Sequence, residues 1–142
     1  MNRSVSDTDD LARLRGLPLF AGLGDDALRR IDALAADIEV PAGQMIVQAG
    51  DAASGMFVIE EGSVIVEARG GIAIELGPGE FVGEFALLVP ESVRSARVRA
   101  ITDVRCIAIG AADFMQLLDD EPRIALVMLP IVAERLWRSR QP

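Results

Sequence analysis

The stretch 81–100 places a carboxylate, Glu84, and a guanidinium, Arg94, ten positions apart. Together they could bind one small molecule that carries a hydroxyl and an anionic phosphate. A carboxylate accepts a hydrogen bond from a hydroxyl, and the planar fork of arginine matches a phosphate. Gly83 lets the backbone come close to such a ligand, because glycine has no Cβ. A helical turn beginning at Glu84 would add free N–H groups that favour an anion, so a nucleotide with a single phosphodiester charge suits this set.

The strand expected at residues 96–101 determines how Arg94 is oriented. Side chains alternate between the two faces of a strand, so residues of equal parity share a face. The inward face carries Ala96, Val98 and Ala100, and the outward face carries Arg97 and Arg99. Arg94 has the inward parity if the strand geometry extends back to it, and an inward guanidinium needs an anion. Glu84 is one candidate, as an internal ion pair without a ligand, and a bound phosphate is the other.

The composition argues against an enzyme, because the chain contains no histidine. This removes Ser-His-Asp and Cys-His catalysis, the usual haem ligand and nearly all zinc sites. We therefore expect no catalytic residue, no metal and no cofactor. The single cysteine, Cys106, lies in an alternating apolar run and is expected to be a small core residue. A net charge of −8 argues against a nucleic-acid-binding surface.

The 142 residues are expected to form one domain, which is long enough to bury a core. Residues 1–10 are polar and acidic and are expected to be a flexible tail, so the domain comprises residues 11–142. The longest apolar run, Ile124–Ala133, is too short to span a bilayer, and the N-terminus does not resemble a signal peptide. These features predict a cytoplasmic protein or module, without membrane insertion by this chain.

Helix signals lie at both ends of the chain, and strand signals fill the middle. A short helix is expected around Leu11–Leu17, and Asp25 or Asp26 could cap a second one. Short β-rich runs separated by glycine turns follow at residues 45–48, 56–60, 63–68, 72–76, 96–101 and 104–109. Strands spaced so regularly indicate an antiparallel sandwich or barrel over about residues 38–110. Helical periodicity then returns at about residues 111–140.

The last helix, expected to begin at Pro122, is unusually apolar. Pro130 is expected to kink or interrupt it, because proline removes one backbone hydrogen bond. The leucine-rich side of this helix either packs in the core or dimerises, and we favour the core because heptad spacing is not sustained. The helix dipole alone explains three basic residues near its end, Arg135, Arg138 and Arg140.

The order of motifs along the chain resembles the cyclic nucleotide-binding domain family. The residues that carry the resemblance are Gly83-Glu84-Phe85-Ala86-Leu87-Leu88, then Arg94-Ser95-Ala96 and Val98. Weaker matches occur at Pro18-Leu19-Phe20, Pro41-Ala42-Gly43, Gly50-Asp51 and Glu61-Gly62-Ser63-Val64. The resemblance implies a mainly β fold with flanking helices: an antiparallel jelly-roll-like β-barrel with N-terminal helices and a C-terminal lid helix.

The resemblance also implies a ligand, cAMP or cGMP, and a role for each residue of the motif. Glu84 would hold the ribose 2′-hydroxyl and Arg94 the cyclic phosphate. The rest of the phosphate shell would comprise the backbone N–H groups of Phe85, Ala86 and Ala96 and the Ser95 hydroxyl. Val64 and Val98 would pack near the base. The serine after the arginine favours cAMP, because family members that prefer cGMP often carry threonine there.

Two departures from the family pattern concern the loop before Arg94 and the strand after it. Val93 stands where many members have proline, which leaves the loop less rigid but keeps every charged contact. Arg97 stands where threonine is common, and its outward parity makes the change harmless. Trp137 could stack on the purine, although we favour its covering apolar surface on the barrel or on a second subunit.

The resemblance also implies a function for the chain and a way in which it would signal. The chain would be a cyclic nucleotide sensor, with cAMP favoured over cGMP, that signals by moving its C-terminal helix about a hinge near Glu121-Pro122 or at Pro130. It could be a homodimer or part of a larger effector protein. The alternative is a degenerate, non-binding barrel that acts as a protein-interaction module, with Glu84 and Arg94 as an internal salt bridge.

Overall fold

The structure, a computed structural model, describes residues 7–47, 55–68, 73–84 and 96–139. Its helices are α1 (Asp7–Arg15), α2 (Asp25–Leu34), α4 (Ala111–Asp120) and α5 (Pro122–Ser139). Its strands are β1 (Ala36–Val40), β2 (Met45–Val47), β3 (Gly55–Glu61), β4 (Val64–Ala68), β5 (Ala73–Leu76), β6 (Phe81–Val82), β7 (Ala96–Ala100) and β8 (Val104–Gly110). None of these helices is both long and apolar enough to cross a membrane.

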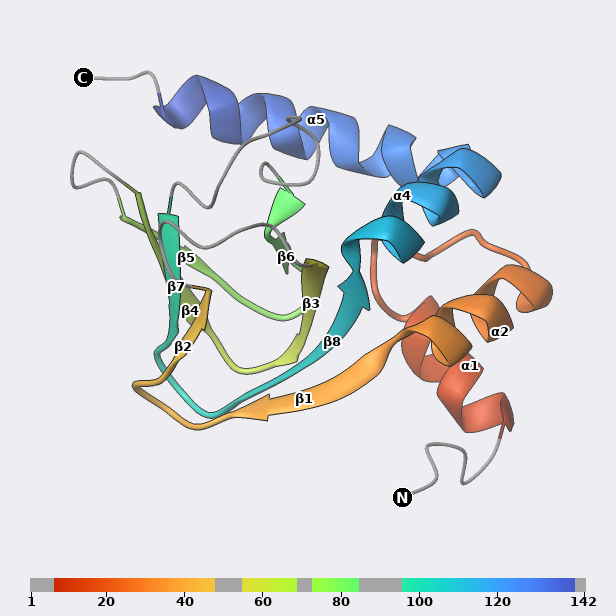
Figure 1. Cartoon of the computed structure of the whole chain (residues 1–142), viewed down its shortest axis with the longest axis horizontal. Helices are drawn as coiled ribbons and strands as arrows, with labels where there is room; N and C mark the ends of the chain where they lie inside the picture. Colours follow the sequence, from red (N-terminus) through yellow and green to blue (C-terminus); the bar gives the residue numbers. More distant parts are fainter. Residues whose placement is uncertain (1–6, 48–54, 69–72, 85–95, 140–142) are drawn as a thin grey trace.

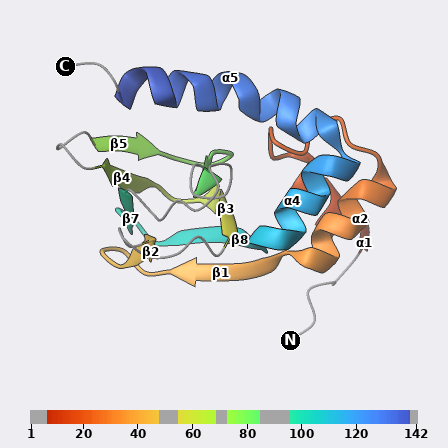
Figure 2. The same ribbon diagram turned by 45° about the horizontal axis from the view of Figure 1, so that its top comes forward.

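The eight strands form two four-stranded antiparallel sheets. The first sheet has the order β1-β8-β3-β6 and the second the order β2-β7-β4-β5. Figures 1 and 2 show the two sheets facing each other, with α1, α2 and α4 gathered at one end and α5 extending from them over the strands. The expected fold class, mainly β and jelly-roll-like with flanking helices, is confirmed.

Strands β3, β6 and β8 of the first sheet are buried on both faces, because their side chains alternate between two cores, whereas β1 is mostly exposed. In β8, Ile107 and Ile109 belong to a core shared with the helices, whereas Val104 and Cys106 belong to a core between the sheets. The residues of the helical core include Leu14, Leu28, Phe114 and Ile124. The β6 strand also divides its side chains, since Phe81 joins the helical core and Val82 the inter-sheet core. The expectation that Cys106 is a buried core residue is confirmed.

Two helices differ from the sequence-based expectation at their N-termini. The N-cap of α2 is Gly24, which makes no side-chain capping hydrogen bond. Asp25 and Asp26 lie inside the first turn, where a carboxylate stabilises the helix through its dipole rather than as a cap. Helix α1 already begins at Asp7, within the segment expected to be a tail, and it buries Asp10 against the fold.

Of the kink or interruption expected at Pro130, the interruption is wrong, because α5 runs as one helix from Pro122 to Ser139. Pro130 cannot donate a hydrogen bond to the carbonyl of Leu126, four residues earlier. Both residues are exposed, so water can bind the carbonyl that has lost its partner. The helix therefore tolerates the proline on its solvent side. Its start at Pro122 agrees with the sequence-based expectation.

Replacement of Gly62 by alanine should destabilise the fold more than replacement of Gly43. Both glycines have a positive φ, 91° and 89°, which strains any L side chain. A Cβ on Gly62 would overlap the carbonyl oxygen of Asp103, whereas a Cβ on Gly43 would meet nothing within 4 Å. We expect a loss of about 1 kcal/mol for Gly43→Ala from the backbone alone. For Gly62→Ala we expect at least about 1 kcal/mol more from the clash. Urea unfolding measures both values, and equal losses would contradict the packing described here.

Candidate ligand-binding site

Glu84 directly follows the end of β6 and is one of two polar residues among the described buried ones, the other being Asp10. Only 3% of Glu84 is exposed to solvent. Gly83, which precedes it, has a φ of 97°, a conformation that favours glycine. The Glu84 side chain that follows this turn is buried in the protein. A buried carboxylate needs a charged or hydrogen-bonding partner, because its desolvation is costly.

The partner of Glu84 among the described residues is Arg135 of α5. Arg135 Nη1 donates to Glu84 Oε2 at 2.7 Å, and the two side chains are 14% and 4% exposed. The guanidinium carbon of Arg135 also lies 4.5 Å from the ring centroid of Phe81, which gives a cation–π contact. Phe81 is the first residue of β6 and Glu84 lies two residues after its end, so one arginine of α5 contacts both.

The position of Arg135 on α5 explains why it reaches the site. Ile124 and Met128 are buried and Val132 packs partly against the helical core, at intervals of four residues on one face of α5. Arg135 is three residues beyond Val132 and extends the same face toward Glu84. The interpretation of Arg135 as a residue explained by the helix dipole is therefore wrong. Its place on the inward face of α5, three residues after Val132, is the sequence signal that could have identified it.

The other arginines near the end of α5 behave differently. Arg138 pairs with Glu134 on the same helix at 2.7 Å, and both side chains are more than half exposed. Arg140 lies outside the described residues. Trp137 is 66% exposed, so within this chain it does not cover the barrel, and the favoured interpretation of its role is not supported for the barrel.

The interior of the barrel beside Glu84 is apolar. Val64 and Val98, expected near a base, are 0% and 3% exposed and belong to the inter-sheet core with Leu76 and Val82. The alternation expected for the strand of residues 96–101 is confirmed on its outward face, since Arg97 and Arg99 both pair with Glu67 at the surface. The core between the sheets offers apolar side chains that suit a flat hydrophobic part of a ligand, and Glu84 offers an acceptor for a hydroxyl.

Four of the seven expected site residues, Phe85, Ala86, Arg94 and Ser95, lie outside the described residues. Ala96 starts β7, where it pairs in register with Ala68 of β4. Gly83 and Glu84 lie at the end of β6, which belongs to the first sheet, whereas β7 belongs to the second. The roles of all seven residues stay predictions.

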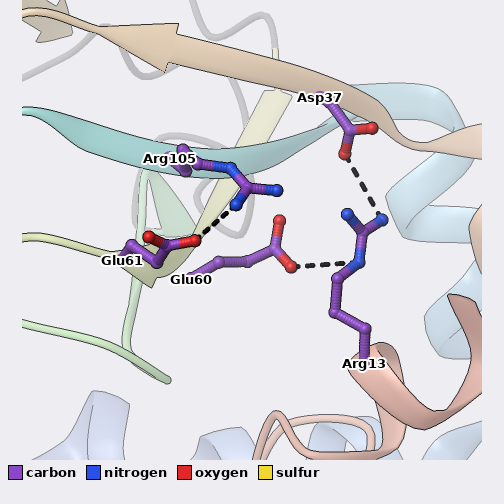
Figure 3. A network of polar contacts seen from close by, with 5 residues as sticks. All are labelled: Arg13, Asp37, Glu60, Glu61 and Arg105. Carbon is purple, nitrogen blue, oxygen red and sulfur yellow. Dashed lines mark hydrogen bonds and ion pairs between the residues drawn. The ribbon is translucent and has the colours of Figure 1, made fainter. Parts of the chain in front are cut away.

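A second polar cluster lies on the first sheet where it meets α1 (Figure 3). Arg13 of α1 pairs with Glu60 at 3.2 Å and with Asp37 at 3.5 Å, and Arg105 pairs with Glu61. Arg13 thus joins α1 to β1 and β3, and Arg105 joins β8 to β3. No group of three metal-ligating residues occurs within the described ranges. We interpret this cluster as a structural contact and not as a binding site.

Two facing antiparallel sheets and a buried carboxylate that pairs with the C-terminal helix define the class of the protein: a jelly-roll module with flanking helices. The family model described as "Cyclic nucleotide-binding domain" matches residues 37–121, more than half of the chain. The chain belongs to the cyclic nucleotide-binding domain family, a family of regulatory domains, as the motif resemblance implied.

Relatives and solved structures agree with this assignment. The chain is 40% identical over 119 residues to a cyclic nucleotide-gated potassium channel of Mesorhizobium japonicum, a match that covers 84% of this chain and 33% of the channel. It thus spans about a third of that relative. The catabolite activator protein of Thermus thermophilus is 29% identical, with a TM-score of 0.71 over 86% of this chain and 59% of that one. The regulatory subunit of a cAMP-independent protein kinase A from Trypanosoma brucei shares the fold, with a TM-score of 0.82, 22% identity and coverage of 95% and 50%.

The Cys106 thiol should be inert in the folded protein. Burial, and secondly the charge of Glu60, raise the pKa of this thiol to about 11. Two pKa units above the ordinary value correspond to an about 100-fold lower thiolate fraction at neutral pH, and the thiolate is the reactive form. Alkylation by iodoacetamide at pH 7.5, followed by mass spectrometry, should be about 100-fold slower in the native protein than in urea. Comparable rates in both states would show that Cys106 is accessible and reactive.

Proposed function

We propose that this domain binds a cyclic nucleotide, cAMP in preference to cGMP, and regulates an attached or associated effector through α5. The observation that carries the proposal is the buried Glu84 carboxylate, which follows the positive-φ Gly83 at the apolar end of the barrel. Family membership supports the class of ligand. The name of the 40% identical relative, a cyclic nucleotide-gated potassium channel, supports the same class of ligand.

Glu84 is proposed to accept a hydrogen bond from the ribose 2′-hydroxyl. A carboxylate repels a phosphate, so its presence beside a phosphate-binding segment makes sense when it binds a neutral hydroxyl of the same ligand. Val64 and Val98 belong to the apolar core between the sheets, and they are proposed to contact the base. We assign the cyclic phosphate to Arg94, with Ser95 and the backbone N–H groups of Phe85, Ala86 and Ala96. The serine at position 95 is the basis for preferring cAMP.

Signalling is proposed to depend on the position of α5. A ligand shifts an equilibrium only when it interacts differently with the two states, and α5 is the element that contacts Glu84 directly. The residues of this domain are proposed to bind and not to catalyse. The outer side of α5 carries exposed apolar residues, Leu126, Leu129, Leu136 and Trp137, which are suited to contact a second copy or an effector.

Calorimetric titration with cAMP and cGMP tests the proposed ligand. We expect both nucleotides to bind, with the tighter affinity for cAMP. Arg94→Ala should reduce affinity by about 10- to 100-fold, because a hydrogen bond to a charged group is worth about 1.5–3 kcal/mol. Arg97→Ala is the matched control, since this arginine lies three positions away and pairs with Glu67 on the outer surface. Its affinity should equal that of the unmodified protein.

Two results would contradict the proposal. Absence of heat with either nucleotide at millimolar concentration would favour the non-binding interaction module. Equal losses of nucleotide affinity in Arg94→Ala and Arg97→Ala would show that the effect comes from the removal of a positive charge and not from the loss of a phosphate contact.

A further inference from the structure

The outer side of α5 carries a continuous apolar stripe. Eight residues on this side of the helix are all exposed and apolar: Pro122, Ala125, Leu126, Leu129, Pro130, Ala133, Leu136 and Trp137. The three leucines and the tryptophan are between 50% and 69% exposed. Figures 1 and 2 show α5 along the outside of the molecule. Soluble monomers rarely expose an apolar surface of this extent, so the stripe is a candidate interaction surface.

The stripe lies on the side of α5 that faces away from its own domain. Ile124 and Met128 are buried in the helical core. Leu126 is two residues from each of them, which places it more than half a turn around the helix. A partner that packs on the stripe therefore leaves the contacts between α5 and its own domain intact. For the same reason, substitutions on the stripe do not disturb the core.

The spacing of the stripe fits a second helix. Leu126, Leu129, Ala133 and Leu136 follow one another at intervals of three, four and three residues. This is the spacing of the a and d positions along which two helices pack in a coiled coil. A partner helix needs an apolar seam of the same spacing and length, and α5 of a second copy of this chain provides one. We therefore take a second copy as the occupant.

The sizes of the side chains in the seam determine the direction of the second helix. In a parallel pair each residue faces its own counterpart, so two Ala133 side chains would meet and leave the seam underfilled between two leucine layers. In an antiparallel pair with its two-fold axis level with residue 131, Leu129 faces Ala133 of the second copy. Leu126 then faces Leu136 of the second copy. Each layer contains a leucine, and large residues face small ones in the middle of the seam, where the layers can interdigitate.

The charges at the two ends of α5 favour the same direction. Asp119 and Glu121 directly precede the helix, and Arg138, with its side chain 57% exposed, lies near its end. In the antiparallel pair Arg138 is level with residue 124 of the second copy, within about one helical turn of Glu121. The two helix dipoles are then also opposed, which is favourable. A parallel pair would instead place the two acidic segments side by side.

We propose that two copies of this domain associate through their α5 stripes, with the two helices antiparallel. The barrels then lie on opposite sides of the helix pair, because each barrel packs on the side of α5 opposite its stripe. The seam contains no residue assigned to the ligand. The inference therefore goes beyond the proposed function and does not depend on nucleotide binding.

Sedimentation equilibrium over a range of protein concentrations tests the association. We expect the unmodified protein to form dimers. Leu129→Glu should raise the dimer dissociation constant by about 100-fold or more, because it buries an uncompensated carboxylate from each copy in the middle of the seam. Ile101→Glu is the matched control, since Ile101 is 40% exposed but lies on the barrel, in the turn between β7 and β8. It should leave the dissociation constant unchanged, and circular dichroism should show that both variants are folded.

Disulfide formation between introduced cysteines tests the direction, in a Cys106→Ala background that removes the native thiol. In the antiparallel pair, position 126 of one copy faces position 136 of the other. The two copies of position 126 lie about 15 Å apart along the helix axis, too far for a disulfide. A mixture of Leu126→Cys and Leu136→Cys proteins should therefore form linked dimers on oxidation. Each variant alone should form at least about tenfold fewer.

Three results would overturn the proposal. A monomer at a protein concentration of about 1 mM would show that the stripe does not bind a second copy and would leave it for an effector protein. An unchanged dissociation constant in Leu129→Glu would place the interface elsewhere on the molecule. Efficient crosslinking of Leu126→Cys alone would show that the helices are parallel. Both experiments contain no nucleotide, so a failure of cyclic nucleotide binding would leave their results unchanged.

Discussion

A carboxylate that is buried without water must be paired, and in this domain that requirement connects the barrel to its last helix. Glu84 is 3% exposed and its described partner, Arg135, comes from a helix 51 positions further along the chain. Removing one partner of a buried ion pair leaves the other uncompensated, which typically costs several kcal/mol. The placement of α5 and the charge state of the site therefore depend on each other.

The first sheet makes this arrangement possible, because it has a core on each face. Phe81 and Val82 are neighbours in β6, yet one packs with the helices and the other between the sheets. The strand ends where these two cores meet, and the chain turns at Gly83 with a φ of 97°. Glu84 consequently lies where the β6 end and α5 come together, so the proposed ligand would act on the helix through this residue.

Much of the fold could be predicted from local sequence patterns, because the periodicity of apolar residues and the positions of turn residues are local properties of the sequence. Alternation correctly assigned Arg97 and Arg99 to the surface, and the β-rich runs predicted six of the eight described strands to within one residue at each end, but neither β1 nor β6. The patterns failed where a tertiary environment decides the outcome. Pro130 was expected to interrupt α5, but the exposed carbonyl of Leu126 can bind water, and the helix continues.

The site was only partly predictable for the same reason. The motif selected Glu84 because a carboxylate after a glycine is unusual near a phosphate-binding segment. Its described partner, Arg135, depends on how α5 packs against the rest of the fold, which the sequence does not give directly. The sequence does show that Arg135 lies on the same face of α5 as Ile124, Met128 and Val132. Arg94 remained a sequence-based assignment throughout, as it lies outside the described residues.

The role of Glu84 is tested most directly by comparing cAMP with 2′-deoxy-cAMP in calorimetric titrations of the unmodified protein and of Glu84→Gln. A hydrogen bond from a hydroxyl to a charged carboxylate is worth about 1.5–3 kcal/mol. The account therefore predicts that the deoxy analogue binds the unmodified protein about 10- to 100-fold more weakly than cAMP, and that this difference falls to a few-fold in Glu84→Gln. Equal affinity of both nucleotides for the unmodified protein would contradict it, because Glu84 would then not be the acceptor of the sugar hydroxyl.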